Sequence, residues 1–265
     1  MQLGIGSFTL VRNEIRWIVP HILNVLPHLD QMVFFDGHSE DGTLQAIRGI
    51  ASDHPHGRKI KLVPGKDPAN LRNAYVEMFN ECMWSLDTDF AVFLHPDMYV
   101  QNPEQFAQVK KSDAIALYTH MESYAGEPGG QLYRIEQGRG ELWKNIYRLK
   151  KPNLGAHYHG WYGAGDEDVY FKHITGSDYQ HHGQQMDRYP YSVEDSGLHI
   201  MHFSDVRTFN RRIGRMVTSL INQGHSHESA QRIAAEHPRV TLKEEHGFKF
   251  VPAEYPAQFK EAVRA

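Results

Sequence analysis

Strand-like and helix-like segments alternate over residues 1–100, and this alternation constrains the fold more than any other feature of the sequence. Short apolar runs rich in β-branched and aromatic residues occur at 3–11, 31–36, 59–64 and 90–94. Between them, apolar residues recur at helical spacing in the segments 13–29, 43–50 and 68–86. Strands that alternate with helices form βαβ units whose strands pair in parallel. The sequence therefore predicts an α/β fold with a mostly parallel central sheet flanked by helices.

The second part of the chain is less regular. Strand-like segments occur at 113–121 and 146–151, helix-like segments at 205–223 and 226–235, and an aromatic, proline-rich tail at 246–258 is expected to wrap the surface. There is neither an internal repeat nor a low-complexity linker. We expect a single domain with an α/β half at 1–100 and an irregular half at 101–265 that carries the C-terminal helices.

Composition excludes several classes of protein. The net charge of −4 gives no global electrostatic reason for nucleic-acid binding. A single cysteine, Cys82, excludes an intramolecular disulfide framework and a cysteine-rich zinc site, and it is expected to be a small buried apolar residue. No apolar stretch is long enough to span a bilayer, and the first residues do not resemble a signal peptide. The expected location is the cytoplasm.

Polar clusters follow each of the four expected strands. They are Arg12-Asn13-Glu14, then Asp36 with the turn GHSEDGT, then Lys66 with Arg72 and Asn73, then His95-Pro96-Asp97. Ligands of open parallel sheets bind outside the carboxyl ends of the strands, so these clusters are expected to meet at one edge. Lys66 and Arg72 can neutralise a diphosphate, although solvated surface cations would give the same pattern. The motifs GxGxxG and GxxxxGK[ST] do not occur, which argues against a dinucleotide-binding Rossmann domain and a P-loop enzyme.

Four segments resemble, in their order and spacing, the nucleotide-binding half of family-2 glycosyltransferases with the GT-A fold. They are LVRNE, VFFDGHSEDGT, LRNA and FLHPDM. The resemblance covers about residues 5–100 and is most specific in DGHSEDGT. It implies a metal-dependent glycosyltransferase that uses a nucleoside-diphosphate sugar, with UDP as the first candidate. The implied nucleotide-binding residues are Val11, Arg12, Asn13, Glu14, Asp36, Arg72 and Asn73, and the charge argument for a diphosphate adds Lys66. Asp36 would accept a hydrogen bond from the base.

The family's D-x-D metal motif is changed to His95-Pro96-Asp97 in this chain. Asp97 matches the second carboxylate, which binds the metal. His95 stands in place of the first aspartate and could bind the cation, contact the sugar or ribose, or only cap the strand. A histidine could shift the preference from Mg²⁺ towards Mn²⁺. The resemblance also implies a late histidine that completes the metal shell, with His202 as the better match and His199 as the alternative.

The acceptor half is expected to supply a general base. The segment GWYGAGDEDVYF resembles a family motif in which an acid activates the acceptor, and it contains Asp166, Glu167 and Asp168. Adjacent like charges raise the pKa of at least one carboxyl, which suits a base, although the acids could also begin a solvated helix. Asp168 is the first candidate and Glu167 the second. A competing alignment instead places His157 or His159 at the acceptor cleft.

The acceptor could be a small molecule, a glycan, a protein or a modified DNA base. A phage-type DNA glycosyltransferase acting on a hydroxymethylated base is one alternative, because an arginine-rich stretch could follow phosphates. Its members are Arg207, Arg211, Arg212 and Arg215. A second alternative is a non-catalytic protein that binds nucleotide sugars. A nucleotidyltransferase would need a glycine-rich, lysine-containing loop after the first strand, which LVRNE does not provide.

Overall fold

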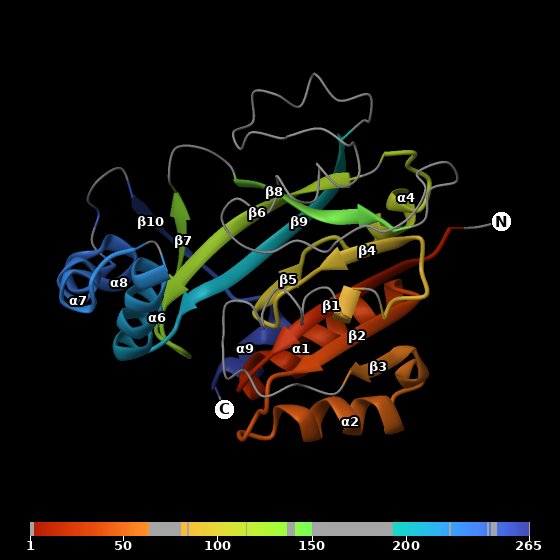
Figure 1. The fold of residues 1–265 in the computed structure, drawn as a ribbon, viewed down its shortest axis with the longest axis horizontal. Coiled ribbons are helices and arrows are strands. Elements are labelled where there is room, and N and C mark those ends of the chain that lie inside the picture. The colour runs from red at the N-terminus through yellow and green to blue at the C-terminus, as the bar shows by residue number, and fades with distance from the viewer. Residues whose placement is uncertain are drawn as a thin grey trace. The chain divides into compact units, whose positions relative to one another are not determined.

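The computed structural model describes residues 3–63, 81–83, 85–114, 116–136, 141–149, 193–222, 224–242, 244 and 248–264 (Figure 1). The chain divides into two compact units, each assembled from separate segments. Unit 1 comprises 1–96, 102–119 and 143–198, and unit 2 comprises 97–101, 120–142 and 199–265. The division into halves at residue 100 stays a prediction.

Unit 1 contains the predicted parallel sheet. Its strands are β1 (Ile5–Val11), β2 (Gln31–Asp36), β3 (Ile60–Val63), β4 (Phe90–Phe93) and the part of the antiparallel β8 (Glu141–Arg148) that falls within it. β1 lies between β4 and β2, β3 pairs with the far side of β2, and these pairings are all parallel. β8 pairs antiparallel with β4. The sheet is therefore mostly parallel, as the sequence predicts.

Two helices of unit 1 follow predicted segments, and a third helix of four residues was not predicted. They are α1 (Ile15–Val25), α2 (Thr43–Asp53) and α4 (Phe106–Val109), with 3₁₀ turns at Leu26–His28, Gly57–Lys59 and Pro103–Gln105. Of the helix predicted at 68–86, residues 68–80 and 84 lie outside the described residues. α1 buries Trp17, Ile18 and Ile22, which recur at helical spacing, and it continues through Pro20. The N-cap residue of α2 is Gly42 with φ +95°, a conformation that glycine adopts without steric cost.

Aromatic packing between β1 and β4 forms the core of unit 1. Phe8 and Phe93 are paired in register, and their stacked rings have centroids 5.2 Å apart. Cys82 is fully buried in the same cluster, as predicted, and burial raises the pKa of its thiol. This core supports the strands whose carboxyl ends carry the predicted site residues.

Unit 2 is built on antiparallel pairs. Its strands are β5 (Met98–Val100), β7 (Leu132–Glu136), β10 (Lys249–Ala253) and the parts of β6 (Ala116–Gly126) and β9 (Val193–Val206) that fall within it. β7 pairs with β6 and β10, and β5 pairs with β9. The tail expected to wrap the surface therefore contains a sheet strand.

Helices close the C-terminal part of unit 2. They are α6 (Phe209–Asn222), α7 (His227–Glu236), α8 (Pro238–Thr241) and α9 (Ala257–Arg264). The two helices predicted at 205–223 and 226–235 correspond to α6 and α7, whose apolar faces form one cluster. Within the described part of the chain, no helix has both the length and the hydropathy that crossing a bilayer requires.

Candidate functional site

Hydrogen bonds connect the loop after β1 with the loop after β2. The backbone N–H of Asn13 donates to Ser39 Oγ at 2.9 Å, and Asn13 Oδ1 accepts from the backbone of Glu40 at 2.8 Å. The backbone N–H of Glu14 donates to Thr43 Oγ1 at 2.8 Å. Asn13 has φ +57°, a conformation that asparagine tolerates better than most residues. The two predicted clusters at these strand ends therefore form one connected structure.

Asp41 completes this connection. Its carboxylate accepts from the backbone of Ile15 at 3.0 Å and from both the backbone and the hydroxyl of Thr43, at 3.0 and 2.5 Å. Burial opposes ionisation, but these hydrogen bonds outweigh it, so the pKa of Asp41 lies below its ordinary value. The residues of the DGHSEDGT block after Asp36 thus hold the loops together.

Replacing Thr43 with valine is expected to lower the free energy of unfolding by about 1–2 kcal/mol, because Glu14 loses the acceptor for its N–H and Asp41 loses a donor. Urea denaturation measures the change. Thr43→Ser keeps the hydroxyl and serves as the control, with a stability closer to that of the wild type. If Thr43→Val lost no more stability than Thr43→Ser, the hydrogen bonds of the Thr43 hydroxyl would not be what stabilises this connection.

Asp36 is the last residue of β2 and is paired in register with Val11, the last residue of β1. The residue is 8% exposed, and its Oδ2 accepts from the backbone of Ser39 at 3.1 Å. Its Oδ1 is buried, and none of the described residues donates a hydrogen bond to it. A buried carboxylate oxygen without a donor is costly, so the position is suited to accepting a hydrogen bond from a ligand.

Unit 2 brings together two of the predicted metal ligands. Asp97 precedes β5, and the next residue, Met98, is paired in register with His202 of β9. Asp97 Oδ1 lies 3.4 Å from His202 Nε2. The main chain holds this arrangement, because the backbone N–H of Phe203 donates to the carbonyl of Asp97 at 2.9 Å.

The pair fits a divalent cation. Metal–ligand bonds of about 2.1 Å place two adjacent octahedral ligands roughly 3.0 Å apart, which is close to the separation of these atoms. Carboxylate and imidazole also suit Mn²⁺. Within the described ranges, no group of three or more His, Cys, Asp or Glu side chains gathers at one place. A cation would therefore need further ligands, which a bound diphosphate can supply.

Arg207 also contacts Asp97, a contact that the sequence did not predict. Its Nη2 donates to Asp97 Oδ2 at 3.2 Å, and the side chains are 17% and 5% exposed, respectively. Arg207 is held in turn, since its Nε donates to the carbonyl of Ser204 at 3.0 Å. No local pattern could indicate a contact between residues that are 110 positions apart.

The other two histidines of interest each have an aromatic neighbour. His95 belongs to unit 1 and is half-buried, with its ring edge-on to Phe93 at a centroid distance of 4.7 Å. His199 is exposed and stacks on His120 at 4.8 Å. Of the two late histidines, His202 is therefore the one that lies beside Asp97.

The remaining predicted site residues lie outside the described residues. They are Lys66, Arg72 and Asn73 of the donor half, and His157, His159, Asp166, Glu167 and Asp168 of the acceptor half. Their roles stay predictions.

Several side chains of the arginine stretch that was expected to follow phosphates instead contact groups of the protein. Arg212 is 5% exposed and donates to the carbonyls of Gly126 and Val240. Arg215 donates to the carbonyl of Ser204, which Arg207 also contacts. Arg211 is exposed. Three of these four arginines thus bind acceptors of their own unit, which weakens the case for an arginine surface that contacts DNA.

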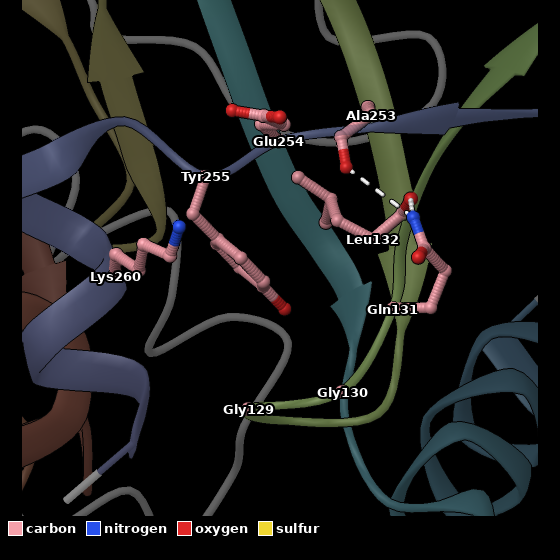
Figure 2. Close-up of a pocket in the computed structure, with 8 residues that line it drawn as sticks. All are labelled: Gly129, Gly130, Gln131, Leu132, Ala253, Glu254, Tyr255 and Lys260. Atoms are coloured by element: carbon pink, nitrogen blue, oxygen red, sulfur yellow. Dashed lines mark hydrogen bonds between the residues drawn. The ribbon is translucent and has the colours of Figure 1, made fainter.

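A pocket of about 160 Å³ lies in unit 2 (Figure 2). It is lined by the turn Gly129–Gly130, by Gln131 and Leu132, by Ala253, Glu254 and Tyr255, and by Lys260. Figure 2 shows the Tyr255 ring between the side chains of Leu132 and Lys260, and a hydrogen bond from Gln131 to the carbonyl of Ala253. None of these lining residues is one of the predicted site residues, so this pocket is separate from the predicted set.

Comparisons with known proteins identify the fold. No protein-family model matches the chain, and no curated protein matches it. Among solved structures, it is similar to a mannosyltransferase from Pyrobaculum calidifontis in complex with GDP-Man and Mn²⁺, with a TM-score of 0.52 and 14% identity over 91% of this chain and 74% of that chain. A glucosyl-3-phosphoglycerate synthase from Mycobacterium tuberculosis, in complex with Mn²⁺ and UDP, matches at a TM-score of 0.39 and 14% identity over 84% and 81% of the two chains. The similarity to the mannosyltransferase, together with the mostly parallel sheet, shows that the chain has the GT-A type of α/β fold found in nucleotide-sugar transferases.

Proposed function

We propose that the chain is a family-2-like glycosyltransferase that transfers a sugar from a nucleoside-diphosphate sugar, most simply a UDP-sugar, to a hydroxyl acceptor. The observation that carries the proposal is the position of Asp36. It lies buried at the carboxyl end of β2, within the connected loops, where open parallel sheets bind ligands.

Asp36 is suited to recognising a base. One oxygen is held by the backbone of Ser39, and none of the described residues donates to the other. A ring N–H of uracil, thymine or guanine would supply a donor to this oxygen. Val11 and the loop Arg12-Asn13-Glu14 adjoin Asp36 at the ends of the paired strands and would form the rest of the nucleotide pocket.

Asp97 and His202 are the residues that would hold Mn²⁺ or Mg²⁺, and His95 is a further candidate. When bound, the cation would stabilise the negative charge that develops on the departing diphosphate. Lys66, Arg72 and Asn73 would bind that diphosphate and its nucleoside. Asp168, or Glu167 in its place, would take the proton of the acceptor hydroxyl if the reaction inverts the anomeric configuration.

A thermal-shift screen tests the donor. With a UDP-, GDP- or dTDP-sugar at about 100 times its Kd, the stabilisation should reach about 2.7 kcal/mol, equivalent to a rise in Tm of about 5–10 °C. Mn²⁺ should increase the shift. Asp36→Ala should abolish the shift caused by the nucleotide, whereas Asp53→Ala, which removes an exposed carboxylate of the same unit, should keep it.

Three results would contradict parts of the proposal. If no donor stabilises the protein, the nucleotide-sugar site is absent. If UDP binds equally with and without Mn²⁺ and no donor is hydrolysed, the non-catalytic alternative is correct. A strongly salt-dependent affinity for duplex DNA would favour the DNA-modifying alternative.

A further inference from the structure

We infer that Arg207 neutralises the carboxylate of the cation site, so that the cation binds strongly only together with the diphosphate of the donor. The inference rests on the proposed function of Asp97 and His202 as metal ligands. It adds a role for Arg207, which would couple the binding of the cation to the binding of the diphosphate.

The first step is the contact itself. Arg207 Nη2 lies 3.2 Å from Asp97 Oδ2, while Asp97 Oδ1 lies 3.4 Å from His202 Nε2. One oxygen of the carboxylate therefore faces the guanidinium and the other faces the imidazole. A cation bound to Asp97 Oδ1 and His202 would have one charged ligand, Asp97. The same carboxylate also contacts the positive guanidinium of Arg207.

The Arg207 side chain cannot easily move away from Asp97. Its Nε donates to the carbonyl of Ser204 at 3.0 Å, and its backbone N–H donates to the carbonyl of Gly126 at 3.2 Å. The buried Arg212 donates to the carbonyl of Arg207 and pairs with Glu127 at 3.0 Å. Main-chain and side-chain bonds thus fix the guanidinium next to Asp97.

The charge of Arg207 affects how strongly Asp97 can bind a cation. A guanidinium beside a carboxylate offsets the negative charge of that carboxylate, and its positive field repels a metal cation at the same group. Guanidinium also keeps its charge at any ordinary pH. A histidine that binds a metal does so as the neutral imidazole, so Asp97, Arg207 and a metal-binding His202 would together carry no net charge and would attract Mn²⁺ weakly. The diphosphate brings the negative charge that the site lacks, which makes the two ligands bind cooperatively.

The test measures Mn²⁺ binding by electron paramagnetic resonance, with and without UDP. The wild type should bind Mn²⁺ weakly alone and much more tightly with UDP. Arg207→Gln should bind Mn²⁺ alone about tenfold more tightly, and the enhancement by UDP should fall by a similar factor. Arg207→Lys keeps the charge and should behave like the wild type. Arg211→Gln removes an exposed arginine from α6 and is the matched control, with no change expected.

The outcomes separate this inference from the proposed function. If the wild type binds Mn²⁺ and Arg207→Gln binds it equally or more weakly, the inference is wrong while the metal site stands. If the wild type fails to bind Mn²⁺ under both conditions, the metal site and the inference fall together. Should Arg207→Gln not fold, strong UDP-independent Mn²⁺ binding by the wild type or by Arg207→Lys would overturn the inference.

Discussion

Replacing Phe8 with alanine is expected to destabilise the protein by about 3–5 kcal/mol, among the largest effects that a single apolar truncation produces. Phe8 is fully buried in β1, stacks on Phe93 of β4 and is paired in register with Val33 of β2. Removal of the ring leaves a cavity between three strands, which the closely packed neighbours can fill only in part. Urea denaturation should show a lower midpoint, and the Tm should fall by about 10 °C or more.

Phe209→Ala is the matched control. Phe209 is 44% exposed at the start of α6, so its truncation should cost less than about 1 kcal/mol. A similar loss of stability in both variants would show that the β1–β4 contact is not a centre of the core. Because the loop after β1 carries Asn13 and Glu14, Phe8→Ala should also weaken nucleotide binding at temperatures near its reduced Tm.

The parallel sheet could be predicted because its strands are buried on both faces. Such strands appear in a sequence as continuous apolar runs, and QMVFFD and FAVF are of this kind. The 14-residue strand β9 was not predicted. Its second and third residues are Glu194 and Asp195, it contains Gly197 at φ +66°, and it buries Ser196 and Ser204, so its composition does not indicate a strand. Pairing with β5 positions this segment, and that pairing is not encoded locally.

The site shows the same contrast. Strand order and the rule for parallel sheets correctly grouped Asp36 with the loop that contains Asn13. The roles of Ser39, Asp41 and Thr43 as connectors of the loops depend on three-dimensional geometry that a motif does not reveal. The burial of the Arg212 side chain could not be predicted either, because the arginines of a helix are normally expected at the surface.

Replacing Asp97 with asparagine is expected to reduce sugar transfer, or hydrolysis of the donor, by about 10³-fold. Asparagine keeps the shape of the side chain but removes the charge that Arg207 contacts and that the proposed cation would contact. Loss of a charged metal ligand removes several kcal/mol of transition-state stabilisation, and about 1.4 kcal/mol corresponds to a factor of ten in rate. The increase in Tm that Mn²⁺ adds to nucleotide binding should disappear in this variant.

A loss of stability must be separated from this loss of function, because removing one partner of a buried ion pair leaves the other charge uncompensated. Asp205→Asn is the control, since Asp205 is also buried in unit 2 and its Oδ2 forms an ion pair with Arg239 Nη1 at 3.6 Å. Both variants should unfold at lower urea concentrations than the wild type, yet only Asp97→Asn should lose Mn²⁺-dependent binding and turnover. If Asp97→Asn kept the wild-type response to Mn²⁺, Asp97 would be a structural partner of Arg207 and the cation would have to bind elsewhere.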